Sequence, residues 1–228
     1  MKIHDKIEIV DLALKYKDIL IIGDLQLGYE GYLNQKGILV PRFQFKEIKE
    51  RLNKILKKVK IKKLIFNGDI KHEFGTISNQ EWREILQLID LIPKSIEIIF
   101  VKGNHDIVLN PVARKRGVKV VDYYKIDDIT IMHGDKIMPN LSKILIIGHE
   151  HPAISFEEKK DEKFKCFLKG KWKNHTLIVM PSFNFLTIGS DVTKEKRLSP
   201  FLKQDLRNYM DNEKIENLKD IGGVAHSK

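Results

Sequence analysis

Short runs of isoleucine, leucine and valine recur along this chain and are separated by polar segments. Five of these runs are continuously apolar rather than alternating, which is typical of strands buried on both faces of a sheet. They are DILIIG at 18–23, KLIFNG at 63–68, IEIIFVKG at 96–103, DITIM at 128–132 and KILIIG at 143–148. We therefore predict a core built around five strands.

Two segments between the first three runs have the periodicity of amphipathic helices. In the first, apolar residues recur at steps of three and four from Phe45 to Val59. The second begins at Ser78, which forms a capping box with Glu81 ahead of apolar positions that continue to Ile89. The order strand, helix, strand, helix, strand predicts parallel pairing with right-handed crossovers.

The second half of the chain is predicted to be rich in strands joined by short turns. From about Val118 the sequence favours one hairpin around 126–128 and another around 170–174. A polar segment after Pro200 favours a last helix. With no internal repeat and no linker in 228 residues, we predict an α/β fold in which residues 1–228 form a single domain.

Composition narrows the class of protein. Hydrophobic residues make up 42% and charged residues 32%, which suits a soluble globular protein. Cys166 is the only cysteine, the first residues lack a signal-peptide core, and no apolar run is long enough for a membrane helix. We predict a cytoplasmic protein with no membrane partner. The net charge of +10 favours polyanions or, equally, a charged surface of the kind found in heat-adapted proteins.

Each of the five runs is followed by a side chain able to bind a metal ion or a phosphate. These side chains belong to Asp24, Asp69, Asn104, His105, His133, His149, Glu150 and His151. In open α/β sheets the ligand site lies beyond the carboxyl ends of the strands, so we expect these groups to converge. A single such residue is usually a turn former or a structural histidine, but five strand ends together favour a site.

Carboxylate, carboxamide and imidazole donors without a thiolate indicate hard or borderline divalent ions. Mn²⁺, Fe, Zn²⁺ and Mg²⁺ all stay open on this reasoning. Two ions are favoured over one, because the donors exceed what a single tetrahedral centre uses. Two ions facing two carboxylates would also keep the surplus positive charge needed to hold a phosphate.

The ordered motifs resemble the signature of the calcineurin-like metallophosphoesterases. They are Asp24-Leu25-Gln26, Gly68-Asp69, Gly103-Asn104-His105-Asp106, His133 and Gly148-His149-Glu150-His151. Within that family the chain is most similar to the archaeal SbcD-related and the bacterial ligase-associated repair phosphoesterases, a similarity that includes GDIKHEFG, MPSFN and LSPFL. The resemblance implies a four-layer α/β/β/α sandwich with mixed sheets and two divalent ions, with Mn²⁺ favoured. It also leaves room for a repair-protein partner.

The resemblance also assigns roles to single residues. The first metal site would comprise Asp24, Gln26, Asp69 and His151, and the second Asp69, Asn104, His133 and His149, with Asp69 shared. His105 would face the scissile phosphate and stabilise or protonate the departing alkoxide. Asp106 is expected to orient the His105 imidazole through its other ring nitrogen. Gln26 stands where the family most often has histidine, which predicts a weaker ligand.

Substrate-binding candidates lie outside these motifs. His72 could contact substrate at the rim, and Arg42 could clamp a phosphate oxygen, although each also fits an exposed surface position. Tyr29, Tyr32 and Phe74 could line a pocket or simply pack.

Two lysine-rich segments give a further candidate surface. The segments KKVKIKK at 57–63 and KGKWKNH at 169–175 could track a phosphate backbone, with Trp172 stacking on a base, or form a solvated face. Cys166 is expected to be a buried packing residue.

The sequence thus predicts a two-metal hydrolase that cleaves phosphodiester bonds in nucleic acids or nucleotides. A nucleotide or nucleotide-conjugate pyrophosphatase or phosphatase stays open, because the motif serves several phosphoester classes. A nucleic-acid-binding repair accessory with a degraded metal centre is a third reading, for which Gln26 would be the first sign.

Overall fold

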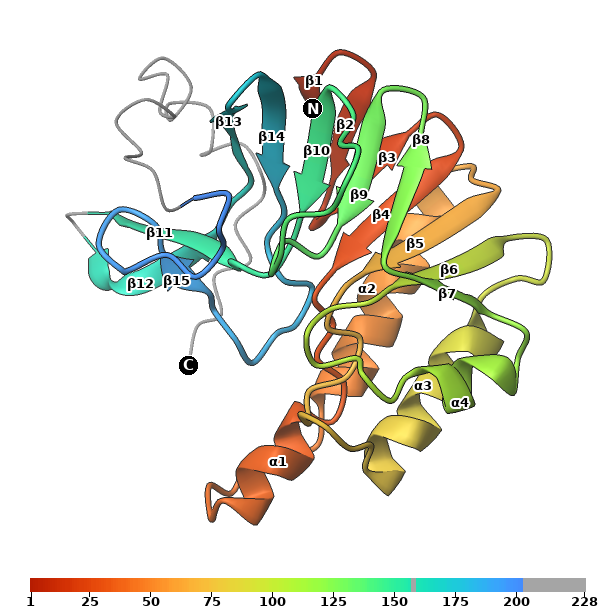
Figure 1. The fold of residues 1–228 in the computed structure, drawn as a ribbon. Coiled ribbons are helices and arrows are strands. Elements are labelled where there is room, and N and C mark those ends of the chain that lie inside the picture. The colour runs from red at the N-terminus through yellow and green to blue at the C-terminus, as the bar shows by residue number, and fades with distance from the viewer. Residues whose placement is uncertain (157–158, 203–228) are drawn as a thin grey trace.

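The structure is a computed structural model and describes residues 1–156 and 159–202. Figure 1 shows two large sheets stacked on each other, with helices on the outside of one of them and a small sheet beside the other. The seven-stranded sheet follows chain order: β1 (Lys2–His4), β2 (Ile7–Val10), β3 (Ala13–Tyr16), β4 (Ile19–Gly23), β5 (Lys63–Asn67), β6 (Glu97–Val101) and β7 (Lys119–Val121). This arrangement confirms a mixed α/β fold.

The parallel part of the first sheet is the predicted one. Strands β4, β5, β6 and β7 pair in parallel. The connections carry α2 (Gln44–Lys58) and α3 (Asn79–Leu91), as the periodicity predicted. The capping box is confirmed too, because the Ser78 hydroxyl accepts the Glu81 N–H while the Glu81 carboxylate accepts the Ser78 N–H.

The first three strands were not predicted. They form an antiparallel meander that leads into β4. Each turn contains a residue with left-handed backbone: Asp5 (φ 40°), Asp11 (φ 59°) and Lys17 (φ 53°). Alternation of buried Ile7 and Ile9 with more exposed neighbours, bounded by Asp-containing turns, was the available signal.

The five-stranded sheet has the order β13-β14-β10-β9-β8. Its strands are β8 (Tyr123–Ile126), β9 (Ile129–Met132), β10 (Ile144–Ile147), β13 (Leu168–Trp172) and β14 (His175–Val179). Strands β9, β10 and β14 run parallel, so their carboxyl ends share one edge. Both predicted hairpins are confirmed, as β8–β9 and β13–β14.

The hydrophobic core follows the layers. Ile48 and Leu52 of α2 pack with Ile85 and Leu88 of α3 against one face of the first sheet. Between the two sheets lies an isoleucine-rich cluster: Ile21, Ile65, Ile99, Ile131, Ile146 and Ile178. On its outer face the second sheet, with Trp172 of β13, packs against Val192, Phe201 and Leu202. The first three layers of the predicted α/β/β/α sandwich are therefore present. In residues 1–156 and 159–202, no helices form the predicted fourth layer on the outside of the second sheet.

The remaining elements lie at the edges. They are α1 (Tyr29–Gln35), α4 (Asn110–Arg114) and a small sheet of β11 (Pro152–Phe156), β12 (Lys159–Lys165) and β15 (Ser190–Asp191). The helix predicted after Pro200 falls almost entirely outside the described residues. None of the described helices is long and apolar enough to cross a bilayer. The cytoplasmic location and the single domain over 1–228 stay predictions.

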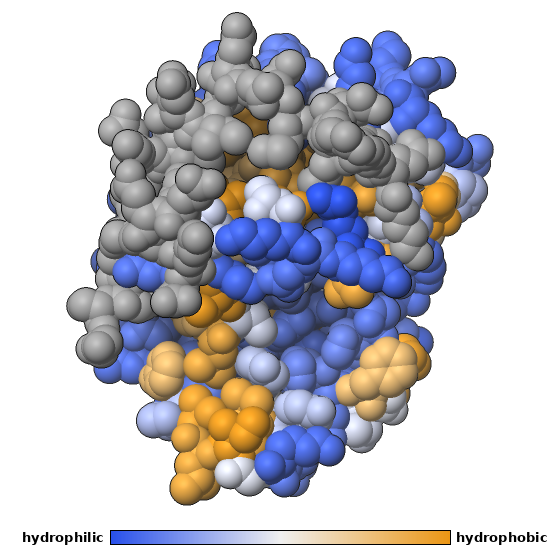
Figure 2. All heavy atoms as spheres, turned by 90° about the vertical axis from the view of Figure 1, so that its left-hand side faces the viewer, coloured by the Kyte–Doolittle hydropathy of each residue, from blue (hydrophilic) through white to orange (hydrophobic). Residues whose placement is uncertain are grey.

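The surface on the left of Figure 1 is mixed in character. Figure 2 shows a band of hydrophilic side chains across the middle of this face and hydrophobic side chains gathered at its lower end. This lower end is at the height of α1 in Figure 1. The segment after α1 exposes Ile38 and Leu39.

Candidate metal centre

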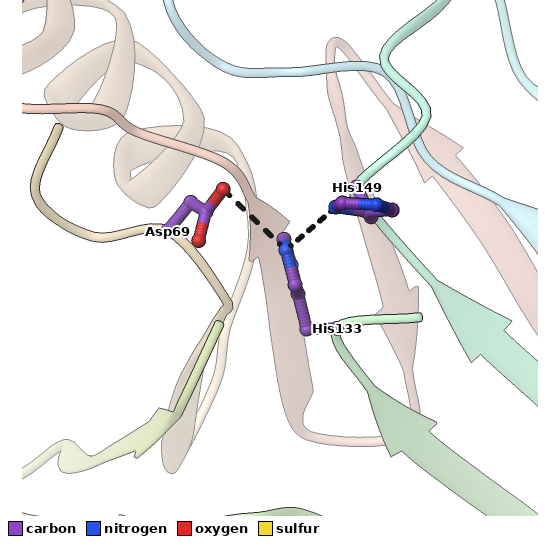
Figure 3. Close-up of side chains that lie close together, drawn as sticks. All are labelled: Asp69, His133 and His149. Carbon is purple, nitrogen blue, oxygen red and sulfur yellow. Dashed lines mark hydrogen bonds and ion pairs between the residues drawn. The ribbon is translucent and has the colours of Figure 1, made fainter. Parts of the chain in front are cut away.

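The carboxyl ends of the parallel strands in both sheets meet, and they carry the predicted donors. His133, which follows β9, contacts three of the other predicted donors through one ring nitrogen. Its Nε2 atom lies 2.9 Å from Asn104 Oδ1, 3.1 Å from His149 Nδ1 and 3.4 Å from Asp69 Oδ2. Figure 3 shows Asp69, His133 and His149 pointing toward one another from three separate strand ends, and ligand atoms of these three lie within 4.8 Å of each other.

Asp24 joins this group from the end of β4. Its Oδ1 atom lies 3.4 Å from His133 Nδ1 and 3.4 Å from His151 Nε2, and its carboxylate accepts the backbone N–H of His149. Six of the seven predicted donors are thus brought together. We call Asp24, Asp69, Asn104, His133, His149 and His151 the metal-ligand cluster.

Gln26 contacts the cluster through its backbone. Its backbone N–H donates to the Asp69 carbonyl over 2.8 Å. In the described part of the chain, no hydrogen bond joins its side-chain amide to the metal-ligand cluster. Gln26 therefore ties the Asp24 turn to the Asp69 turn through its backbone.

The cluster has the electrostatics of a cation site. Burial opposes a charged imidazole, yet Asp69 and Asp24 raise the pKa of His133 to about 9. Burial likewise opposes the Asp69 carboxylate, but His133 and His105 hold its pKa well below its usual range. Burial and the neighbouring His133 lower the pKa of His149. A proton on His133 thus supplies positive charge beside the two carboxylates. A bound divalent ion would supply that charge instead, and its binding would release the proton.

Two further observations fit a bound ion. The buried atoms His133 Nδ1 and His151 Nε2 have no hydrogen-bond partner among the described residues. Space beside the carboxylates is also kept free of side chains: a Cβ on Gly103 would overlap Asp69 Oδ1, and one on Gly148 would overlap Asp24 Oδ2. These donors, with no thiolate, suit hard or borderline divalent ions.

The backbone of the cluster is held in sparsely populated conformations. Five predicted ligands have left-handed φ values: Asp24 (51°), Gln26 (47°), Asp69 (42°), His149 (66°) and His151 (47°). Such non-glycine positions cost about 1–3 kcal/mol each and persist where surrounding contacts fix them. Here the fixing contacts include the backbone bonds Gln26 N to Asp69 O and Gly148 N to His133 O, both 2.8 Å.

His105 lies beside the cluster, and one of its ring nitrogens is hydrogen-bonded. Its backbone N–H donates to Asp69 Oδ1 (3.1 Å), and its Nδ1 atom is hydrogen-bonded to the carbonyl oxygen of His72. A carbonyl can only accept, so Nδ1 carries the proton. The other nitrogen, Nε2, is 3.9 Å from Asp69 Oδ2 and faces the cluster.

The prediction that Asp106 orients the His105 ring is wrong. Its fully buried carboxylate accepts the backbone N–H groups of Gly103 (2.9 Å), Ile70 (3.1 Å) and Lys71 (3.3 Å). Asp106 thereby joins the turn that carries Asn104 to the turn that carries Asp69. Burial and the nearby Asp69 raise its pKa to about 6. The carbonyl of His72 takes the orienting position instead.

His72 is surrounded by aromatic rings. Its ring centroid lies 4.3 Å from Tyr29, 4.8 Å from Tyr32 and 5.6 Å from His105. Burial, followed by the charge of His105, lowers its pKa to about 4, so the ring is neutral at pH 7. Any contact that His72 makes with substrate is therefore that of a neutral ring.

The remaining candidates differ in their exposure to solvent. Arg42 is exposed and lines a pocket between α1 and α3. Trp172 is only 4% exposed and packs 4.8 Å from Phe201, so the suggestion that it stacks on a base is wrong. Cys166 is buried as expected, and burial raises its pKa to about 12.

Sequence reasoning missed a half-buried lysine whose charge interacts with Asp24. Lys165 Nζ donates to the Ser182 carbonyl and hydroxyl (2.8 and 2.7 Å) and to the Asn184 carbonyl. Burial lowers its pKa to about 7. Asn184 in turn donates to the carbonyl of Leu25, next to Asp24. The MPSFN motif was the only signal, and nothing in it indicates its lysine partner.

The chain belongs to the calcineurin-like phosphoesterases, whose family profile matches residues 17–207. A search of curated proteins finds no match. Among solved structures, the chain is similar to the nuclease MPE of Pseudomonas putida, with a TM-score of 0.64 and 17% identity over 82% of this chain and 86% of that one. It also matches AQ665 of Aquifex aeolicus, a protein of unknown function, with a TM-score of 0.40 and 22% identity over 63% and 82%.

Family membership makes the protein a hydrolase of phosphoesters, and enzymes of this family generally depend on two metal ions. Asp69, His133 and His149, within the metal-ligand cluster, form a possible site for an ion. The narrower similarity to the SbcD-related and ligase-associated subgroups stays a prediction.

Proposed function

We propose that this protein hydrolyses phosphodiester bonds in nucleic acids or nucleotides with two divalent ions, of which Mn²⁺ is the favoured one. The observation that carries this proposal is the convergence of six predicted donors from five strand ends in a member of this family. The nuclease among the similar structures supports a nucleic-acid substrate, although at 17% identity that likeness concerns the fold. The net charge of +10 also favours a polyanion.

The ligand sets are those that the family resemblance implies. Asp69 would be shared between both ions. Asp24 and His151 would complete one site, with Gln26 or water in the remaining position, and Asn104, His133 and His149 would complete the other. The bound ions would supply Lewis-acid stabilisation of the phosphoryl oxygens and an activated water.

His105 would act on the leaving group. The His72 carbonyl holds Nδ1–H, which leaves Nε2 turned toward the site. Because Nδ1 already carries a proton, a second proton at Nε2 makes His105 an imidazolium, and that proton would be in place to stabilise or protonate the departing alkoxide. Asp106 supports this only indirectly, by fixing the turns on either side.

The test is hydrolysis of a small chromogenic phosphodiester with added Mn²⁺ by the wild type, Asn104→Ala and His105→Ala. We expect turnover by the wild type, a large loss in Asn104→Ala and a measurable loss in His105→Ala. Equal turnover in all three proteins would contradict the proposal. It would favour the accessory reading, for which Gln26, standing where the family most often has histidine, would be the first sign.

A substrate panel separates the remaining classes. Single-stranded and duplex DNA, RNA, cyclic nucleotides and dinucleotides would be incubated with the Mn²⁺-loaded protein. If every polymer fails while dinucleotides are turned over well, the substrate is a nucleotide conjugate and not a nucleic acid. A chromogenic monoester would reveal phosphatase activity in the same series.

A further inference from the structure

A pocket of about 580 Å³ opens between α1 and α3, beside the loop that carries His72. Its lining includes Tyr32, Arg42, Glu73, Gln80 and Arg83. None of these residues belongs to the metal-ligand cluster. We call it the α1–α3 pocket.

Its two arginines form no ion pair among the described residues, and the charge of Arg83 acts on the neighbouring Glu84 without contact. Arg42 and Arg83 are exposed, and neither forms an ion pair with a carboxylate in residues 1–156 or 159–202, whereas Arg116 and Arg51 each pair with an aspartate. One carboxylate, Glu73, also lines the pocket. Two unpaired guanidinium groups suit a phosphate, because their planar N–H groups match its oxygens.

Aromatic rings link this pocket to the reaction centre. The Tyr32 ring, which lines the pocket, lies 4.8 Å from His72, and the His72 ring lies 5.6 Å from His105. On the outer side, Phe74 is 63% exposed and stands edge-on to His105 with centroids 5.6 Å apart. An exposed ring face at this position is available to stack on a base.

The wall of the pocket is fixed relative to the metal-ligand turns. The Gly28 N–H, at the start of α1, donates to Glu84 of α3 over 3.2 Å. The Gln44 side chain donates to the Leu25 and Gln26 carbonyls, both over 3.1 Å, while its backbone N–H donates to Glu30 of α1. The pocket and the cluster are therefore parts of one rigid surface.

We propose that the α1–α3 pocket binds a non-scissile phosphate of a single-stranded polynucleotide, held by Arg42 and Arg83, while Phe74 stacks on an unpaired base beside the scissile bond. This inference rests on the proposed function and names the substrate class for the same centre. Single strands are favoured because base faces in a duplex are already stacked on their neighbours.

The test compares a single-stranded oligonucleotide with a small chromogenic diester, which cannot reach the pocket. In the double variant Arg42→Gln/Arg83→Gln, we expect kcat/KM for the oligonucleotide to fall about 10- to 100-fold relative to that for the diester, mainly through KM. The slope of log KM against log salt should shrink by about 0.7 for each phosphate that the variant no longer neutralises. Phe74→Ala should lower kcat/KM for the oligonucleotide by about 5- to 150-fold.

A charge-matched control is available in Lys94→Gln/Lys143→Gln. These exposed lysines precede β6 and β10, so they lie at the opposite ends of these strands from Asn104 and His149. The control should leave both substrates unaffected. Thermal unfolding of each variant checks that the fold is kept.

The outcomes are distinguishable. No turnover of the small diester by the wild type would overturn the proposed function itself. Turnover of the diester with an unchanged oligonucleotide KM in the arginine variant would overturn only the pocket inference, as would equal losses in the lysine control. Preference for a nucleoside diphosphate or for duplex DNA over the oligonucleotide would also overturn it.

Discussion

The metal-ligand cluster and the α1–α3 pocket are neighbours, but they are built in opposite ways. The cluster lies at strand ends, has three buried and three half-buried members, and includes left-handed backbone at four of the six. The pocket is lined by half-buried and exposed residues of helices and loops, and its arginines form no ion pair in the described residues. The chemistry is placed by rigid backbone, while substrate contacts rest on side chains that can adjust.

This contrast teaches where substitutions should act. A change in the cluster disturbs several donors together, because His133 alone contacts Asn104, His149 and Asp69. A change in the pocket removes one side chain and leaves its neighbours in place. Effects should therefore be large and shared in the cluster, and smaller and substrate-dependent outside it.

The largest expected effect belongs to His105→Ala acting on an oligonucleotide. We expect kcat to fall about 10²- to 10⁴-fold, because the departing alkoxide needs a proton. The loss on a nitrophenyl diester should be much smaller, since nitrophenolate leaves without one. Steady-state kinetics on both substrates measure this difference, with Mn²⁺ affinity by calorimetry as the control. Equal losses on both substrates would rule out a general-acid role.

A second prediction tests the space reserved beside the carboxylates. Gly148→Ala should weaken Mn²⁺ binding by about 10- to 100-fold, because the new Cβ would displace Asp24. Gly23→Ala is the matched control: Gly23 also precedes a predicted ligand, but its Cβ would meet Met180 Cβ at 3.6 Å, an ordinary contact. Similar affinities for the two variants would show that the cluster tolerates displacement.

A third prediction concerns pH. In the metal-free protein the pKa of His133 is raised to about 9, so an ion must displace its proton at neutral pH. Apparent Mn²⁺ affinity should rise about tenfold per pH unit and level off as the pH passes about 9. Calorimetric titration in buffers of different ionisation enthalpy counts the released proton. An affinity that does not change between pH 6 and 8 would speak against this account.

The same shift predicts the stability of the metal-free fold. Because the folded pKa of His133 is raised, its contribution is fully present below pH 6.5 and is lost as the pH rises through about 9. Denaturant unfolding in a chelator follows this loss.

The smallest expected effect on catalysis is that of Asp106→Asn. The substitution should lower the free energy of unfolding by about 1–3 kcal/mol, because part of the acceptor set for three backbone N–H groups is removed. The pH–rate profile should keep its shape, since His105 is oriented by the His72 carbonyl. A shifted profile with unchanged stability would restore the orienting role of Asp106.

Several elements could be predicted because their signals are local. Continuous apolar runs identified the central strands, and the Ser78–Glu81 pair identified the start of α3. The short strands β1 to β3 and the helix α1 were missed. Their sequences are polar at alternate or irregular positions, and they form largely through pairing with β4 and anchoring by Glu84.

The candidate site could be predicted in its donors but not in its supporting contacts. Asp24, Asp69 and His133 follow strands whose ends must share an edge, so their meeting follows from topology. The supporting contacts depend on partners distant in sequence. They include the hydrogen bonds of the Asp106 carboxylate, the burial of Trp172 and the hydrogen bonds of Lys165 to Ser182 and Asn184. No local pattern encodes such pairs.

By itself, the sequence determined the donor types, their order and the parallel strands that carry them, because hydrophobic periodicity and glycine-containing turns are properties of contiguous residues. Tertiary structure alone decided which donors touch and which ring nitrogen of His105 is free. It also decided that the Gln26 backbone bonds to the Asp69 carbonyl. It also decided that two arginines far apart in the chain line one pocket. These outcomes depend on how separate turns and helices pack, which is fixed only once both sheets and α1 are in place.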